Sequence, residues 1–118
     1  MSQDAFVDAI DRIRNRDPRF RREAYVFLLT ALEFVVRSLP EPRHITGREL
    51  LDGVALMAKQ QFGMMAPAVF AEWGVQSSTD IGEMVFQLVE ARLLGKQPED
   101  SMQDFEGFDL PAALGVGR

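Results

Sequence analysis

A stretch of sixteen positions, residues 24–39, is apolar on almost every side of a helix. At 100° per residue only one narrow arc differs, and it contains Val26, Thr30, Glu33 and Arg37. Such a helix cannot face water over most of its surface, so it must be surrounded by other elements or by another chain. The stretch therefore predicts a helix that is central in the core or held in an oligomer interface, and two following prolines end it.

Four other segments repeat apolar residues at helical spacing between start and stop signals. Thr46 and Glu49 form a capping-box pattern, and Gly63 stops the helix that follows. We expect helices at about residues 3–14, 18–38, 47–62, 66–73 and 78–94. Asp17 is expected to cap the second helix, with Pro18 at its first position.

The helical pattern stops after Gly95, and residues 98–118 are expected to form an irregular acidic tail. We predict an all-α fold, a single compact bundle of about five helices over residues 1–110 with a flexible tail at 111–118. Strand content should not exceed one short pair near residues 93–96 and 104–110. The third to fifth helices have the spacing of a winged-helix unit.

Composition removes several classes of site. The 118 residues include no cysteine and one histidine, and the formal net charge is −5. A disulfide scaffold, thiol catalysis and cysteine-based metal sites are excluded, and no phosphate-binding glycine motif is present. We expect no cofactor and no metal. The sequence shows neither a signal peptide nor a stretch long enough to span a membrane, which predicts a cytoplasmic protein.

Several short segments together have a familiar pattern. They are AYVF at 24–27, RHITGRELL at 43–51, FGMMA at 62–66, WGV at 73–75, TDIGEMVFQLV at 79–89 and DF at 104–105. The chain resembles the Minf-type hypothetical proteins, a small family of uncharacterised bacterial proteins, over about residues 20–110. Members usually close with a Tyr-Asp-Phe-like segment, where this chain has Phe108, Asp109 and Leu110. The family has no assigned activity, so the resemblance implies kinship without a mechanism.

Six arginines fall within eleven residues, opposed only by Asp17; they are Arg12, Arg14, Arg16, Arg19, Arg21 and Arg22. Guanidinium groups bind carboxylates or phosphates with two parallel hydrogen bonds. We favour pairing inside the protein, for which the tail offers five carboxylates, or a solvated face. The alternative is an external contact with nucleic acid or an acidic protein.

Two further residues are candidates for a site. His44 lies in the loop before the capping box, where fixing the turn is favoured over a role as general base or pH switch. Trp73, with residues 62–65, is favoured as core over a ligand pocket or partner groove. Gly82 suggests the close approach of a neighbour. The polar side of the fifth helix is expected to be a solvated face; it holds Asp80, Glu83, Gln87 and Glu90.

These observations lead to a ranked set of functions. The first is a non-enzymatic interaction module whose partner is a protein or a second copy of the chain. The alternative is a winged-helix-like regulator that binds nucleic acid through the arginine cluster. A small enzyme using carboxylates around His44 ranks last, because no nucleophile or cofactor motif accompanies it. The candidate contact residues are Arg12, Arg16, Arg19, Arg22, His44 and Trp73.

Overall fold

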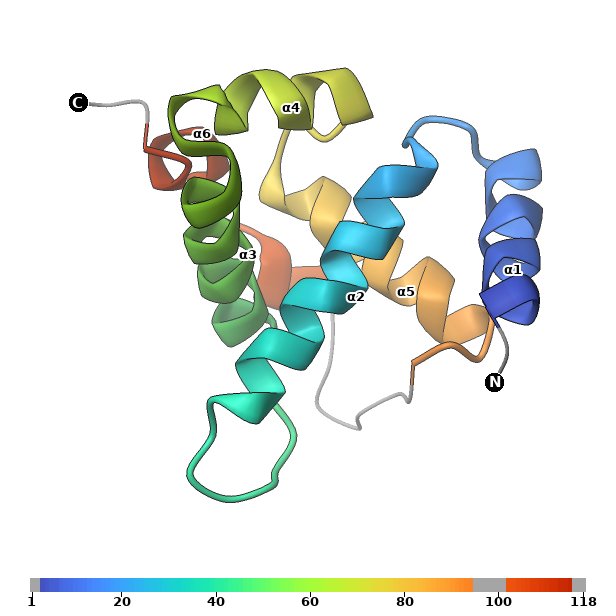
Figure 1. Cartoon of the computed structure of the whole chain (residues 1–118), viewed down its shortest axis with the longest axis horizontal. Helices are drawn as coiled ribbons and strands as arrows, with labels where there is room; N and C mark the ends of the chain where they lie inside the picture. Colours follow the sequence, from blue (N-terminus) through green and yellow to red (C-terminus); the bar gives the residue numbers. More distant parts are fainter. Residues whose placement is uncertain (1–2, 95–101, 116–118) are drawn as a thin grey trace.

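Helices account for all the regular structure in the computed structural model, which describes residues 3–94 and 102–115 (Figure 1). The main helices are α1 (Gln3–Arg16), α2 (Arg22–Arg37), α3 (Gly47–Phe62), α4 (Ala66–Trp73) and α5 (Ser78–Glu90). Short elements are the 3-10 turns η1 (Gly63–Met65) and η2 (Met102–Phe105), and the single-turn helix α6 (Leu110–Ala113). No strand occurs in the described residues, and the prediction of an all-α fold is confirmed.

Helix α2 lies in the middle of the bundle, as its apolar sequence predicts. In Figure 1 it crosses between α1 and α3, and it also packs against α4. Its inner face buries Tyr25 and Leu28 among others. The outer face is only partly covered, because Val26 is 42% and Val36 is 43% exposed. The helix therefore contributes both to the core and to an apolar part of the surface.

Local signals set where α3 and α5 begin. Thr46 and Glu49 form the predicted capping box, and Ser77 and Asp80 form a second one at the start of α5. In each box a side-chain oxygen accepts from a backbone N–H that would otherwise lack a partner. Gly74 ends α4 in the left-handed conformation, at φ 88°.

The predicted start of the second helix is wrong. Helix α2 begins at Arg22, and Pro18–Phe20 form the turn before it. The carboxylate of Asp17 does not cap a helix; it accepts from the backbone N–H and the guanidinium of Arg19. Phe20 is buried at 1% exposure, and the Arg21 N–H donates to the Trp73 carbonyl across 3.0 Å. Burial of the Phe20 ring and this long-range hydrogen bond favour the turn over four more helical residues.

The C-terminal segment is more ordered than expected. Phe105, Leu110 and Leu114 are all at most 4% exposed, and helix α6 packs against α3. The predicted domain end at residue 110 therefore falls inside α6, and the packed body continues to Leu114. Residues 104–110, expected as a strand, hold the end of η2, a bend and the first residue of α6. Of the other expected strand, residues 93–94 form a bend and residues 95–96 lie outside the described residues.

Phe105 explains the predicted close approach at Gly82. An added Cβ at Gly82 would lie 2.7 Å from Cγ of Phe105, and one at Gly47 would lie 3.1 Å from its Cζ. The hydroxyl of the buried Ser78 donates to the Phe105 carbonyl. Packing of the C-terminal segment, and not a ligand, therefore accounts for the glycine in α5.

None of the described helices is both long enough and apolar enough to cross a membrane.

Candidate functional site

The arginine cluster is largely paired within the protein. Arg22 lies 3.0 Å from Asp11 on α1, and Arg21 lies 3.0 Å from Glu72 on α4. Arg19 contacts both Asp17, at 2.7 Å, and Glu83 on α5, at 2.6 Å. The predicted internal pairing is confirmed for these three arginines. The four carboxylates that pair with them in the described ranges are Asp11, Asp17, Glu72 and Glu83, whereas the expectation had been carboxylates of the acidic C-terminal segment.

Two predicted contact residues remain without an ion pair in the described part of the chain. Arg12 and Arg16 are exposed, one helical turn apart on α1. Arg14 between them donates from Nε to the Phe20 carbonyl across 2.9 Å. The basic face proposed for nucleic acid is therefore smaller than the six arginines suggest, because half of the charges already have carboxylate partners.

A hydrogen-bonded chain joins the turn before α2 to α5. The buried Tyr25 hydroxyl donates to Oε1 of Gln87 across 2.7 Å, and Nε2 of Gln87 donates to Oδ2 of Asp17 across 2.7 Å. Asp17 in turn accepts from Arg19, which also contacts Glu83. Burial raises the pKa of Tyr25 to about 12, so its phenol stays a neutral donor.

This chain corrects the expectation of a solvated face on α5. Glu83 and Gln87 hold the α1–α2 turn, and Asp80 accepts from the backbone N–H groups of Gln76 and Ser77. Only Glu90 of the four polar residues is exposed. Most of the polar side of α5 therefore makes contacts within the protein and does not form a solvated face. Its sequence spacing is the same as that of a solvated face, so the partners across it could not be identified from the sequence.

Asp17 makes folding sensitive to acid. Hydrogen bonds from Arg19 lower its pKa from 3.8 to about 2, and its side chain is 24% exposed. Because the pKa of Asp17 is lower in the folded protein than in the unfolded chain, its carboxylate stabilises the fold when the pH is above the unfolded-state pKa. This stabilisation is lost as the pH falls from about 4 to 2. We expect Asp17→Asn to cost about 1 kcal/mol at neutral pH, after allowing for solvent screening. The difference from wild type should shrink toward pH 2 in urea unfolding.

Asp52→Asn is the matched control, because Asp52 is exposed on α3. Part of the acid sensitivity should persist in both variants, since hydrogen bonds from Arg43 also lower the pKa of Glu49 to about 2. If Asp17→Asn unfolds with the same pH profile as wild type, the stabilising role of this carboxylate is wrong.

Trp73 belongs to the core and to a groove at the same time. Its ring lies 5.4 Å from those of Phe27 and Phe70 and 5.7 Å from that of Phe62. An open groove of about 390 Å³ runs beside this cluster. It is lined by Arg22, Glu23, Val26, Phe27, Thr30, Met57, Gln61, Phe62 and Trp73. Trp73 therefore packs in the core, as predicted, and also lines a groove, which was the alternative.

The core role expected for residues 62–65 is wrong for Met64 and Met65, which follow the groove residue Phe62 along the chain but do not themselves line the groove. Phe62 lines it and ends α3, and η1 follows directly with Met64 at 96% and Met65 at 61% exposure. Apolar side chains of this size normally lose most of their exposure on folding. Met64 is therefore the most exposed large apolar side chain in the described part of the chain, two residues after the groove residue Phe62.

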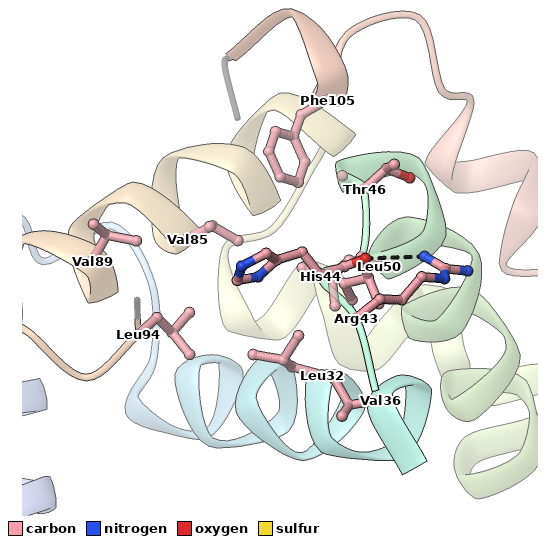
Figure 2. Close-up of a pocket in the computed structure, with 12 residues that line it drawn as sticks. Leu32, Val36, Arg43, His44, Thr46, Leu50, Val85, Val89, Leu94 and Phe105 are labelled. Carbon is pink, nitrogen blue, oxygen red and sulfur yellow. Dashed lines mark hydrogen bonds between the residues drawn. The ribbon is translucent and has the colours of Figure 1, made fainter. Parts of the chain in front are cut away.

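His44 lies at a different site from Trp73. A cavity of about 220 Å³ opens between α2, α3, α5 and η2 (Figure 2). Its lining includes Leu32, Val36, Arg43, His44, Ile45, Thr46, Gly47, Leu50, Val85, Val89, Leu94 and Phe105. Figure 2 shows the imidazole directed toward Val85 and Leu94, while the Arg43 side chain extends the opposite way.

The expectation that His44 fixes its turn through a ring nitrogen finds no support in residues 3–94 and 102–115, where the ring makes no hydrogen bond. Arg43 holds the turn instead: Nη1 donates to the His44 carbonyl across 3.0 Å, and both Nη atoms contact the Glu49 carboxylate. The neighbouring arginine has a longer reach and a forked donor, which leaves the imidazole free to face the cavity.

The six predicted contact residues therefore occupy four places. Arg12 and Arg16 lie on α1, Arg19 is in the hydrogen-bonded chain, Arg22 and Trp73 share the groove, and His44 enters the cavity. Within the described ranges, no three carboxylate or imidazole groups cluster in a way that could hold a metal ion. The sequence analysis did not identify Met57 as part of the groove or the Tyr25–Gln87 link.

Comparisons with family models, with curated proteins and with solved structures find no match for this chain. The resemblance to the Minf-type proteins stays a prediction from its motifs.

Proposed function

We propose that this chain is a non-enzymatic interaction module that pairs with a second copy of itself through the Trp73 groove. The observation that supports this proposal is the exposure of Met64 and Met65 on η1, the turn that directly follows the groove residue Phe62. An exposed apolar segment and an open groove with three aromatic side chains are thus joined through the end of α3.

Two-fold symmetry makes this arrangement self-complementary. In a two-fold dimer each contact occurs twice, so the methionines of one copy can enter the groove of the other while receiving the same contact in return. Methionine suits this role because its unbranched, polarisable side chain adapts to irregular aromatic surfaces. Burying one such side chain contributes about 1.5–3 kcal/mol, and the symmetric contact doubles the effect.

The charges at the groove also favour a second copy over a strongly charged partner. Arg22 and Glu23 line the same groove, and Arg22 is already paired with Asp11. An interface that carries both signs can face itself without a large like-charge repulsion. A strongly acidic or basic helix would gain little from this rim.

Binding of nucleic acid through α1 is the alternative proposal. It has less support, because among the six clustered arginines only Arg12 and Arg16 combine exposure with the lack of an ion pair in the described chain. Two charges release few counterions, which gives weak and strongly salt-dependent binding.

Sedimentation equilibrium tests the dimer. We expect wild type to be dimeric and the double variant Met64→Asp with Met65→Asp to be monomeric, with dimerisation weakened roughly a hundredfold or more. Neither side chain is buried in the monomer, so circular dichroism should be unchanged.

Leu56→Asp is the matched control, because Leu56 is 47% exposed on α3 and does not line the groove. It should leave the dimer intact. A wild-type chain that sediments as a monomer at its highest soluble concentration contradicts the proposal, and so does equal dissociation by Leu56→Asp.

A further inference from the structure

The second inference concerns the cavity at His44 and does not depend on the dimer. We infer that this cavity binds a small, mostly apolar carboxylic acid, with its hydrocarbon part among the aliphatic side chains and its carboxylate against the His44 imidazole.

Size limits the ligand to a short chain or a single ring. An apolar cavity of about 150 Å³ accepts a benzene molecule, so about 220 Å³ has room for roughly nine non-hydrogen atoms. An acid of about eight carbons fills this space when its carboxylate stays at the opening.

The cavity walls that helices α2 and α5 form consist of aliphatic side chains. Leu32 and Val36 come from α2, and Val85 and Val89 come from α5. Phe105 closes another side, held by the Ser78 hydroxyl on its carbonyl. These walls can bury a hydrocarbon chain but cannot satisfy a polar group within it, so the ligand must keep its polarity at one end.

Among the side chains that Figure 2 labels, the His44 imidazole is the only ionisable group directed into the cavity. The Arg43 guanidinium turns away and is held by Glu49, and the lining includes no carboxylate. An imidazole that has no hydrogen-bond partner among the described residues can donate an N–H to a carboxylate, and in its protonated form this hydrogen bond is charge-assisted. A carboxylate is therefore the polar group that complements this opening, whereas an alcohol lacks the charge.

Isothermal titration with octanoate and with 1-octanol tests both halves of the inference. We expect saturable binding of octanoate and about tenfold weaker binding of octanol, because only the acid forms the charge-assisted bond. His44→Gln should weaken octanoate about tenfold while leaving octanol unchanged. Octanol binding equal to octanoate, or octanoate binding that His44→Gln leaves unaltered, overturns the assignment of an acid.

Two matched variants on α2 locate the ligand. Val36 is 43% exposed and lines the cavity, whereas Val26 is 42% exposed and lines the Trp73 groove. Val36→Trp should fill the cavity and abolish octanoate binding, and Val26→Trp should preserve it. Octanoate that binds Val36→Trp as well as wild type, or that does not bind wild type at all, overturns the site.

The same pair separates this inference from the proposed dimer. Val26→Trp alters the groove, so it should disturb dimerisation while keeping octanoate binding; Val36→Trp should do the reverse. A monomeric wild type that binds octanoate would contradict the dimer alone.

Discussion

Replacing Phe105 by alanine should lower the free energy of unfolding by about 3–5 kcal/mol, the largest single effect expected for this chain. The ring is 3% exposed and packs in a T-shaped arrangement with Phe86, with centroids 6.4 Å apart. It also packs against both Gly47 and Gly82, where an added Cβ would lie 3.1 Å and 2.7 Å from its ring atoms. Against a typical total of about 5–15 kcal/mol, the loss is a large share of the stability.

Urea unfolding followed by circular dichroism measures this effect, with Phe108→Ala as the matched control. Phe108 is only partly buried and packs under the Arg48 guanidinium at 5.2 Å. Its truncation should cost about 1 kcal/mol, the scale of an exposed cation–π contact and some lost area. If the two variants lose equal stability, Phe105 does not anchor the C-terminal segment.

Gly82→Ala tests the same contact from the other side. In the wild-type background the new methyl group meets Phe105 at 2.7 Å and should cost about 1–3 kcal/mol. In the Phe105→Ala background this cost should be smaller but should not vanish, because the ring atoms are gone while the Cβ of residue 105 still lies 2.8 Å from the new methyl group. Additive losses in the double variant would show that the two positions do not contact each other.

The helix starts at Thr46 and Ser77 could be predicted because their signals are local. A side-chain oxygen and a carboxylate three residues later decide the outcome within one turn, and both capping boxes form. Asp17 and Pro18 carry an equally good local signal, yet the helix begins four residues later. There the burial of Phe20 and the hydrogen bond from Arg21 to Trp73 outweigh it, and both depend on partners far along the chain.

The site was predictable in its residue types but not in its partners. Trp73 and His44 were identified as candidates, and each faces a hollow in the surface. The residues that complete each lining come from other helices; examples are Met57 at the groove and Val85 at the cavity. Glu83 and Gln87 show the same limit, because a polar stripe has one sequence pattern whether it faces water or a turn.

Gly74→Ala should cost roughly 2–5 kcal/mol, because the position combines a backbone constraint with a close contact. Its φ is +88°, where residues with a Cβ are strained, and an added Cβ would lie 2.2 Å from the Arg19 carbonyl oxygen. Backbone atoms cannot rotate away as a side chain can. The turn at residues 18–20 would have to move, and the hydrogen bond from Arg21 to Trp73 would be lost with it.

Gly107→Ala separates the two causes. Gly107 also has a positive φ, +77°, but no atom lies within 4 Å of the position its Cβ would take. It should therefore show the conformational cost alone, about 1 kcal/mol. Urea unfolding gives both values, and faster amide exchange at Arg21 in Gly74→Ala reports the displaced turn. Equal costs for the two variants, or an Arg21 amide that keeps its protection, would mean that the contact between Gly74 and Arg19 does not hold the start of α2 in place.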